Sequence, residues 1–424
     1  MATETSSTRQ ISCADDHDPA ALPPEQALER ILTEVRAIDG SEQLALRSAL
    51  GRILAKDIQA PMNVPNHTNA AMDGYAIRGA DLPLKGTRAL KVLGTAWAGR
   101  PFNSEVKPEE CVRIMTGAVM PQGTDTVLMQ EHVERLDERL IRVGPAHKSG
   151  QNVRPAGEDI ALGETVLRAG RRLTPADLGL LASLGIGEVS VRRRLRVAFF
   201  STGDELVSIG EPLSVGAIYD SNRYTLYGML NRLGADMLDL GVVRDIAEDL
   251  QVAFREAAAC ADVLITSGGA SVGEADLVMD TLNRVGQVKF WKVAMKPGRP
   301  LAFGRIGDAF YFGLPGNPVS VMATFYQFVQ PALKQMMGET AIRPLTVKAR
   351  CLTHLKKKPG RVEYQRGILE HANTGELVVR GTGPQGSAIL SSMSEANCFI
   401  VLPMDWGRVE AGTVVDVQPF LGLI

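Results

Sequence analysis

Apolar positions recur at two spacings along the chain, and the spacing separates helical regions from β-rich ones. Over residues 23–37 they fall every three or four residues, which predicts an amphipathic helix with Pro24 at its first position. A second helix is predicted over residues 174–184, with Thr174 as its N-cap and Gly185 at its end. Between them, residues 61–155 alternate short β-like runs with Gly/Pro turns, so no long helix is expected there.

From Leu195 onward, predicted strands alternate with predicted helices. Strands are expected at 196–200, 237–243, 262–266, 288–291, 300–303 and 309–312, and helices at 221–233, 247–259, 275–284 and 318–337. This order predicts a parallel, doubly wound sheet, whose ligand would lie beyond the carboxyl ends of the strands. After Pro344 the pattern is again β-like without helical periodicity, which predicts a small C-terminal β domain.

Composition indicates the broad class of protein but does not indicate a specific function. The 424 residues are 45% hydrophobic and 22% charged with a net charge of -2, so we expect several domains and no nucleic-acid or membrane partner. The basic runs 192–194 and 356–358 are short, and solvated strand ends account for them. Five scattered cysteines without a C-x-x-C pair indicate free thiols in a reducing compartment, which predicts a cytoplasmic protein.

The loop after the strand at 262–266 combines glycines with carboxylates. Gly268 and Gly269 would let backbone N–H groups approach a phosphate, yet the acids that follow repel one. A bridging Mg²⁺ resolves this conflict, because it binds one or two carboxylates together with phosphate oxygens. Asp276 would bind it, with Asp245 from the preceding strand end. Alternatively, Asp276 or Glu274 caps the following helix.

Two further loops follow predicted strands and carry polar groups. Residues 201–205 repeat the arrangement of a strand, a small-residue turn and acids, in which Glu205 is the candidate ligand and Asp204 a turn cap. Residues 314–320 form a rigid turn that leads into a helix N-terminus, where backbone N–H groups suit an anion.

The segment 292–300 places three cations, Lys292, Lys296 and Arg299, on a loop with two prolines. Pro297-Gly298 favours a type II turn, and cations on a stiff loop suit an oxyanion. A solvated charged hairpin is the alternative. The sequence contains no G-x-S-x-G motif and no paired Cys/His arrangement, so the available groups favour metal-assisted chemistry on a phosphate or similar oxyanion.

Taken in order, the motifs resemble those of the molybdopterin molybdenumtransferase family (MoeA and the E domain of gephyrin-type proteins). They read MDGYA, IMTGA-x-x-P, VR-x-x-GED, STGDEL, SGG-x-SVGEAD, MKPG-x-P and GLPGNPVS, and the resemblance covers the chain from Pro23 onward. Singly, the first three would be ordinary structural turns. The family implies a multi-domain α/β fold with a MogA-like, molybdopterin-binding α/β domain. The expected units are a disordered tail 1–22, a helical domain 23–60 plus 158–190, a β-rich insertion 61–157, the α/β domain 191–340 and a C-terminal β domain 341–424.

The resemblance also implies an activity and a set of site residues. Family members insert molybdenum from molybdate into adenylylated molybdopterin, require Mg²⁺ and release AMP. They form homodimers whose active site lies between protomers, with an adenylyltransferase and molybdoenzymes as partners. The cleft would be lined by Asp73, Thr116, Arg154, Glu205, Asp245, Asp276, Lys292 and Lys296. The residues that bind the substrate would include Gly268, Gly269, Ser271, Pro315, Asn317 and Pro318. The metal cation would be bound by Asp245 and Asp276, and molybdate by Lys296, Arg299, Ser320, Arg361 and Ser392.

The chain departs from the family pattern just before MDGYA. The family usually has P-x-Phe-Asp-Asn-Ser-Ala, and here His67, Thr68 and Ala70 replace the aromatic residue, the acid and the serine. Arg299 stands where lysine is frequent. Two rival functions remain: an adenylyltransferase that activates molybdopterin with ATP, which would need the α/β domain alone, and a molybdopterin-binding scaffold without turnover.

Overall fold

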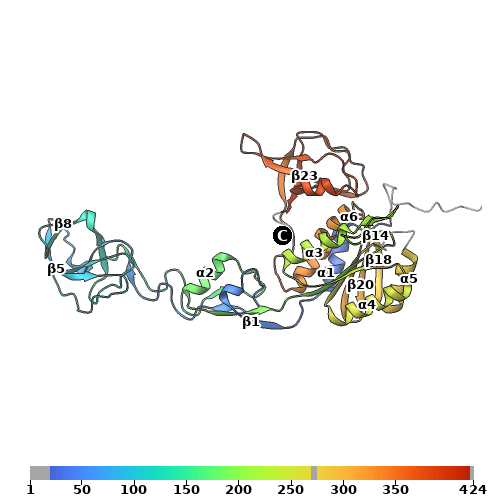
Figure 1. Ribbon diagram of the computed structural model, residues 1–424. Helices are drawn as coiled ribbons and strands as arrows, with labels where there is room; N and C mark the ends of the chain where they lie inside the picture. The colour runs from blue at the N-terminus through green and yellow to red at the C-terminus, as the bar shows by residue number, and fades with distance from the viewer. Residues whose placement is uncertain (1–19, 269–274, 421–424) are drawn as a thin grey trace, which may run out of the picture.

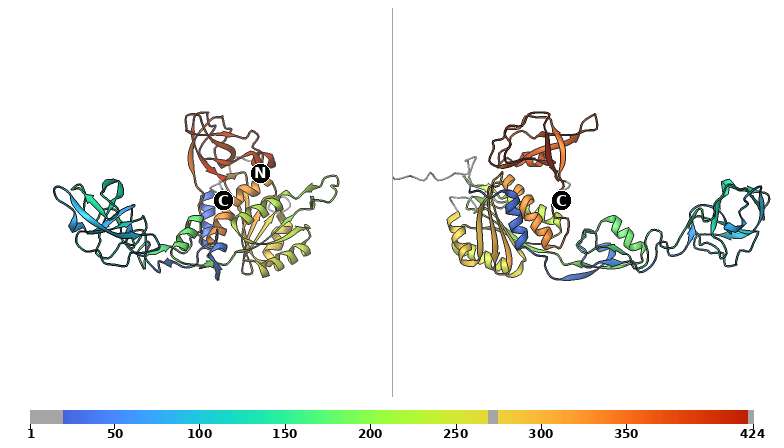
Figure 2. Two further views of the ribbon diagram at one scale, coloured as in Figure 1. Left: turned by 60° about the vertical axis from the view of Figure 1, so that its left-hand side comes forward. Right: turned by 180° about the vertical axis from the view of Figure 1, so that it is seen from behind.

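The computed structural model describes residues 20–268 and 275–420 of the chain, which forms an elongated molecule (Figures 1 and 2). A distal β domain lies at one end. A slender middle segment connects it to an α/β domain, and the C-terminal β domain packs beside that α/β domain. Among the described residues, no helix combines the length and apolar character needed to cross a lipid bilayer.

The α/β domain is built on one twisted sheet with strand order β16-β13-β17-β21-β20-β18. The strands are β13 (Arg196–Thr202), β16 (Asp236–Val243), β17 (Val263–Ser267), β18 (Gln287–Lys292), β20 (Pro300–Ile306) and β21 (Ala309–Leu314). The prediction of an all-parallel sheet was wrong for β20, which pairs antiparallel with both β18 and β21. The reason is the two-residue turn between Ile306 and Ala309, because so short a connection can join only antiparallel neighbours.

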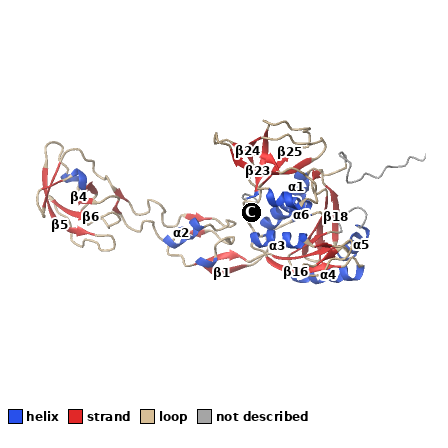
Figure 3. Ribbon diagram, turned by 45° about the horizontal axis from the view of Figure 1, so that its top comes forward, coloured by secondary structure: helices blue, strands red, loops and turns tan. Residues whose placement is uncertain are grey.

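Helices cover both faces of this sheet, as a doubly wound fold requires (Figure 3). On one face α4 (Ala247–Cys260) and α5 (Ala275–Val285) pack against a core that includes Phe200 and Leu264. On the other face lie α1 (Pro24–Glu34), α3 (Ser221–Leu233) and the long helix formed by α6 (Pro318–Thr324), η4 (Phe325–Val329) and α7 (Gln330–Met336). The predicted helix at 318–337 is thus present, with a π-helical turn at η4 that its apolar pattern did not indicate.

The middle segment pairs the chain before the distal domain with the chain after it. β1 (Ser41–Ala45) is antiparallel to β12 (Glu188–Arg192), and β2 (Ile58–Gln59) is antiparallel to β11 (Thr165–Leu167). Its helical content is η1 (Leu46–Ser48) and α2 (Pro175–Ser183), where Thr174 forms a capping box with Asp177. The expected helical domain therefore contains less helix than the sequence indicated, because α1 buries its apolar stripe against the α/β sheet instead.

The two outer domains are predominantly β. The distal sheet has the order β7-β4-β6-β5-β9-β8. Its strands are β4 (Gly74–Ile77), β5 (Arg88–Ala96), β6 (Glu110–Ile114), β7 (Thr126–Met129), β8 (Glu134–Arg135) and β9 (Leu140–Val143), with 3₁₀ turns η2 (Gly79–Asp81) and η3 (Gln130–His132). A separate pair joins β3 (Asn69–Ala70) to β10 (Val153–Arg154). No α-helix occurs in this domain, all of whose residues are described, in agreement with the prediction.

The C-terminal domain closes on itself through a pairing between β23 and β25. Its strands are β22 (Val347–Cys351), β23 (Val362–His371), β24 (Leu377–Gly381), β25 (Cys398–Leu402) and β26 (Val414–Pro419). Two short pairings involve loops of the α/β domain: β19 (Met295–Lys296) adds to β23, and β14 (Leu206–Val207) pairs with β15 (Ile218–Tyr219). The six-residue helix α8 (Leu390–Glu395) corrects the expectation that this region lacks helix, since one and a half turns are too short to produce a periodic pattern.

The short basic runs are not simply solvated strand ends. Lys357 is buried, and its ammonium group donates to backbone carbonyls, including that of Arg361 at 2.9 Å. Arg193 donates from both terminal nitrogens to the carboxylate of Asp262, each at 2.8 Å. Asp262 also accepts from the backbone N–H of Arg196 at 2.8 Å, so this ion pair holds the starts of β13 and β17 together.

We predict that Asp262→Asn lowers the free energy of unfolding by about 1–3 kcal/mol at pH 7 because charge-assisted hydrogen bonds are lost. Burial opposes ionisation, but the bonds from Arg193 and Arg196 outweigh it and hold the pKa of Asp262 below its ordinary value. The stabilisation is therefore present above pH of about 4 and is lost as the pH falls through the lowered pKa.

The measurement is urea unfolding at several pH values, with the exposed Asp236→Asn as control. A stability difference between wild type and Asp262→Asn that stays constant from pH 7 to pH 2 would contradict the assigned charge.

Candidate active site

The carboxyl ends of β13, β16, β17, β18 and β21 meet along one edge of the sheet, here called the rim. β20 begins at the same edge, because Pro300 pairs with Lys292. The loops 203–205, 244–245, 293–299 and 315–318 therefore all lie on the rim, as does Gly268. The sequence had predicted a shared edge for the strand-end loops. The antiparallel course of β20 adds the cation-bearing loop to it.

Asp245 is tied to the end of the neighbouring strand. The hydroxyl of Thr202 donates to its Oδ1 across the β13–β16 pair. Glu205 is exposed on the same rim, and its carboxylate folds over Gly203, where a Cβ would lie 2.6 Å from Oε2. Asp204 is also exposed. Asp245 and Glu205 thus place two carboxylates at the ends of adjacent strands.

Gly268 occupies a position that other residues cannot take. Its φ is +98°, and a Cβ built on it would lie 2.1 Å from the carbonyl oxygen of Thr202. Its N–H donates to the carbonyl of Leu314 at 3.3 Å. Gly316 approaches from the neighbouring loop, so the backbone of two loops is closely packed at this point of the rim.

The rest of the glycine–acid loop is only partly described. Gly269 and Ser271, both predicted on the phosphate side, lie outside the described residues. Asp276 falls in the first turn of α5, and its side chain also lies outside them. The choice between a metal ligand and a helix cap at Asp276 therefore stays a prediction.

Several buried polar atoms on the rim have no hydrogen-bond partner among the described residues. They are Oδ2 of Asp220, Oδ1 of Asn222 and Oγ of Ser267. Asp220 caps α3 and accepts from the hydroxyl of Ser201 at 3.0 Å, and Nδ2 of Asn222 donates to the carbonyl of Gly316 at 2.6 Å. Buried polar atoms without a partner are uncommon in folded proteins, so three of them at one edge of the sheet make the rim a candidate binding site. The sequence analysis missed Asp220 and Asn222, although Asp-Ser-Asn before an amphipathic helix is an N-cap signal that could have drawn attention to them.

The cation-bearing loop is anchored by the C-terminal domain and by α6. Nζ of Lys296 lies 3.8 Å from Oε1 of Glu363, whose other oxygen accepts from Nε2 of Gln365 at 2.7 Å. Gly298 packs so closely against α6 that a Cβ would meet Oγ1 of Thr324 at 2.4 Å. Its φ of +90° agrees with the glycine position of the predicted turn.

The three cations of this loop have different environments. Lys292 and Lys296 are exposed, whereas Arg299 is buried, so the solvated-hairpin alternative was wrong for Arg299. Ser320 is buried beside the loop in α6. An open cavity of about 630 Å³ lies next to Lys296, and it is lined by Lys356, Glu363, Gln365 and the loop 383–386 among others.

Two buried cations support the wall of this cavity. Burial lowers the pKa of Lys357, against the raising effect of Glu363, and its ammonium group is held by the carbonyls of Lys358, Arg361 and Trp406 at 2.9 to 3.1 Å. Burial also lowers the pKa of Arg366, to about 10. Sequence reasoning missed both residues, because their burial depends on the closed C-terminal domain.

Ser392 and the 314–320 turn already form hydrogen bonds within the protein. The Ser392 hydroxyl accepts from Nε of Arg366 at 3.0 Å and donates to the carbonyl of Ile389 at 2.7 Å. The N–H of Val319, at the start of α6, donates to the carbonyl of Ser387 at 3.0 Å. On the same turn Pro315 is buried, Pro318 is half-buried and Asn317 is exposed, and the half-buried Arg361 lies in the C-terminal domain. A direct anion contact at Ser392 stays a prediction.

A second cluster of predicted residues lies in the distal domain. Both the backbone N–H and the hydroxyl of Thr116 donate to Oδ1 of Asp73, each at 2.7 Å. These bonds hold the pKa of Asp73 below its ordinary value, so the exposed carboxylate is ionised at neutral pH. Arg154 pairs with Asn69 between β10 and β3, and its Nε lies 4.0 Å from the carboxylate of Glu158.

The departures from the family pattern border this distal cluster. Ala70 is fully buried in the domain core, and its backbone bonds to Gly117 and Ala118. Thr68 accepts from the N–H of Ala156 at 3.3 Å. The side chain at position 70 therefore packs inside the domain, and the loss of a serine there alters the core beneath the cluster.

The chain by itself does not bring the two clusters together. Asp73, Thr116 and Arg154 belong to the distal domain, at the far end of the molecule from the α/β and C-terminal domains (Figure 3). The remaining described site residues lie on the rim or between it and the C-terminal domain. The predicted set is therefore two separated half-sites within one chain.

The rim residues suit Mg²⁺, which needs only one or two protein ligands, better than a metal ion whose ligands are all protein side chains. Among the side chains that the structure describes, which do not include that of Asp276, no group of three or more His, Cys, Asp or Glu is arranged to hold a metal ion. Mg²⁺ commonly uses one or two carboxylates and completes its shell with water and phosphate oxygens. Asp245, fixed by Thr202 beside the tightly packed Gly268, meets that requirement.

Comparison with known proteins covers nearly the whole chain. Residues 22–185 match "MoeA N-terminal region (domain I and II)", residues 198–335 "Probable molybdopterin binding domain" and residues 348–420 "MoeA C-terminal region (domain IV)". The chain is 45% identical to the molybdopterin molybdenumtransferase of Haemophilus influenzae, over 94% of this chain and 99% of the relative. It is 34% identical to gephyrin of Dictyostelium discoideum, over 93% of this chain and 61% of gephyrin. The crystal structure of molybdopterin biosynthesis moeA protein from Pyrococcus horikoshii OT3 is similar with a TM-score of 0.83 and 30% identity, covering 94% and 100% of the two chains.

We predict that Gly268→Ala displaces the rim loop, because its Cβ would collide with the carbonyl of Thr202 and the positive φ disfavours alanine. The expected loss is about 1–3 kcal/mol in the free energy of unfolding, together with loss of activity. Thermal and urea unfolding measure it. Gly316→Ala is the matched control, because a Cβ there meets only ordinary contact at 3.9 Å. Equal stability of the two variants would disprove the steric argument.

Proposed function

The chain belongs to the MoeA family of molybdopterin molybdenumtransferases, and from this premise we propose that it inserts molybdenum from molybdate into adenylylated molybdopterin and releases AMP. The observation that carries the proposal is the composition of the rim. It combines carboxylates, a glycine against which neighbouring backbone packs closely, and a separate loop that carries cations. A nucleotide phosphate and an oxyanion need different partners, and the rim offers both.

On the phosphate side, Asp245 and Asp276 would hold Mg²⁺ between the rim and the substrate phosphates. When bound, the ion supplies positive charge that stabilises the departing AMP. Gly268, Gly269 and Ser271 would bind the phosphate through backbone and hydroxyl groups. The residues expected beside them are Glu205, Pro315, Asn317 and Pro318. Thr202 contributes by fixing Asp245 through its hydroxyl hydrogen bond.

On the molybdate side, the chain provides cations and hydroxyl donors. Molybdate is a dianion, so Lys296 and Arg299 would neutralise it, with Lys292 nearby and donors from Ser320, Arg361 and Ser392. Glu363 lies 3.8 Å from Lys296 and orients its ammonium group at the cavity edge. The buried Lys357 and Arg366 keep this wall rigid, which favours positioning of the oxyanion next to the dithiolate.

The distal half-site requires a second protomer. We propose a homodimer in which the Asp73–Thr116–Arg154 cluster of one chain completes the rim of the other. The support is the separation of the two half-sites in a single elongated chain and the ionised state of Asp73. The expected setting is the cytoplasm, with an adenylyltransferase that supplies the substrate and molybdoenzymes that receive the product.

The first test is AMP release from adenylylated molybdopterin with Mg²⁺, in the presence and absence of molybdate. We expect release to depend on molybdate, and Lys296→Ala to raise the KM for molybdate about tenfold or more while leaving pterin binding unchanged. Lys85→Ala, at an exposed residue of the distal domain, is the control. Substrate that stays bound without any AMP release would favour the scaffold function instead.

A second test mixes two inactive variants, Asp73→Ala and Asp245→Asn. If the active site lies between protomers, a mixed dimer contains one intact site, so random mixing should restore about one quarter of wild-type activity. The mixture is measured after exchange of subunits, beside each variant alone. Activity no higher than the sum of the separate variants would rule out a shared site.

A further inference from the structure

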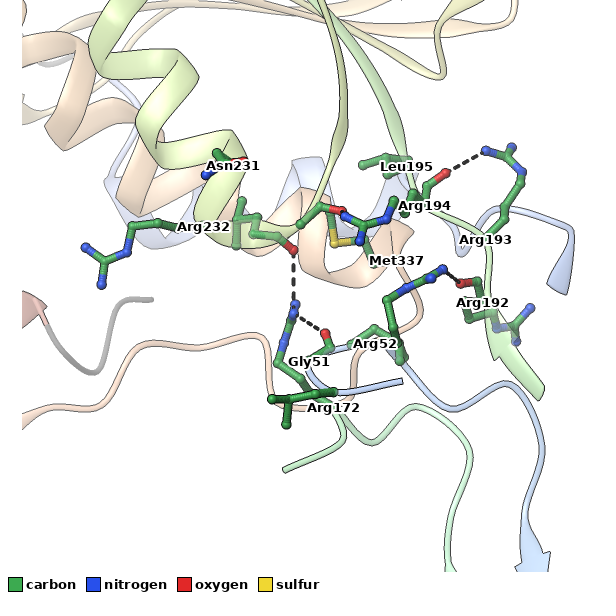
Figure 4. A pocket seen from close by; sticks show the side chains of 14 residues that line it. Gly51, Arg52, Arg172, Arg192, Arg193, Arg194, Leu195, Asn231, Arg232 and Met337 are labelled. Carbon is green, nitrogen blue, oxygen red and sulfur yellow. Dashed lines mark hydrogen bonds between the residues drawn. The ribbon is translucent and has the colours of Figure 1, made fainter. Parts of the chain in front are cut away.

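An arginine-rich pocket lies away from the rim, at the root of the middle segment (Figure 4). Its volume is about 280 Å³, and six of its fourteen lining residues are arginine while none is acidic. It is bounded by the loop 50–53, by residues 192–195 before β13, and by residues 231–234 at the end of α3. The rim faces the other end of α3, so the two sites share no residue.

Arginine side chains from three segments border this pocket. Figure 4 shows the side chains of Arg172 and Arg194 directed toward the end of α3, whereas Arg192 and Arg232 point away from it. Arg52 lies beneath them and donates to the carbonyl of Arg192 at 2.8 Å. Arg172 donates to the carbonyl of Gly51 at 2.8 Å, and Arg194 donates to the carbonyl of Gly234 at 3.0 Å.

The arginines exceed the carboxylates that pair with them. Arg52 pairs with Glu42, Arg172 with Glu339 at 2.9 Å and Arg193 with Asp262 at 2.8 Å. The other three lining arginines, Arg192, Arg194 and Arg232, have no carboxylate partner among the described residues. Nε of Arg192 is buried without a hydrogen-bond partner there. Such an excess of positive charge in a concave site is stabilised by a bound anion.

Capping of α3 accounts for only part of this arrangement. The carbonyls of Leu233 and Gly234 carry the partial negative charge of a helix C-terminus, and Arg172 and Arg194 each donate to one of them. Each guanidinium carries five N–H donors, so donors remain for a further acceptor. The adjoining cavity of about 600 Å³ is lined by four cations, Arg172, Arg232, Lys334 and Arg343, and by one acid, Glu339, which pairs with Arg172, so positive side chains outnumber acidic ones there too.

We propose that this pocket binds a small tetrahedral oxyanion of the phosphate class. The bound ion would bridge the loop 50–53 of the middle segment and the α/β domain at residues 194 and 234. It would therefore stabilise the direction in which the arm carrying the distal domain leaves the α/β domain. The inference does not depend on the proposed reaction, because it involves neither the rim nor turnover.

The test is titration with inorganic phosphate by calorimetry, at constant ionic strength maintained with chloride. Lys296→Ala is used as the background, so that oxyanion binding at the rim is weakened and the remaining binding reports mainly on the arginine pocket. We expect this variant to bind phosphate saturably, and Lys296→Ala with Arg194→Gln to bind it about tenfold more weakly or worse. Arg47→Gln in the same background is the matched control, since Arg47 is exposed in the same segment and does not line the pocket.

Equal affinity with and without Arg194→Gln, or no saturable binding to Lys296→Ala, would overturn the proposal. A second measurement does not depend on the folding of any variant. Crystals of the unmodified protein soaked in selenate should show an anomalous peak within hydrogen-bond distance of Arg194, and a pocket without such a peak at saturating selenate would also overturn it.

Discussion

The direction of the strands in the α/β sheet is the constraint on which the remaining structure depends. Because β13, β16, β17, β18 and β21 run the same way, their carboxyl ends form a single rim. The reversal of β20 has its own consequence, since the connection from Lys292 to Pro300 must turn at that same edge. One sheet thus places the acids at 205 and 245, the glycine at 268 and the cations at 292–299 along one line.

The C-terminal domain, which is separate from the α/β sheet, shapes the side of the rim that carries the cations. β19 adds to β23, and Glu363 on that strand approaches Lys296. Behind it, two cations are buried among backbone carbonyls rather than carboxylates. Burying them lowers the pKa of both Lys357 and Arg366, and their hydrogen bonds hold the loops that bound the cavity. The C-terminal domain would therefore act as a rigid wall for the oxyanion that we propose binds there.

The elongated arm separates the two half-sites and concentrates positive charge at its root. At the far end of the arm, Thr116 donates two hydrogen bonds to the carboxylate of Asp73, which they keep ionised. At the near end, Arg52, Arg172 and Arg194 gather where the middle segment joins the α/β domain. In the proposed dimer, the arm would align the distal half-site with a second chain only if this junction is stiff, so an anion bound in the arginine pocket would also support that alignment.

Local pattern was enough to predict many elements and several of the strand-end loops, although Gly74 of the MDGYA motif, predicted as a turn, begins strand β4 (Gly74–Ile77). The helix at Ser221–Leu233 has the predicted bounds, because Gly234 with φ +79° ends it. The motif order also indicated the family, and the comparisons confirmed it. Only the tertiary structure decided the reversal of β20, the packing of α1 on the sheet, the burial of Lys357 and the convergence of Arg52, Arg172 and Arg194. Each of these depends on partners distant in the sequence, whereas pattern and capping act over a few residues.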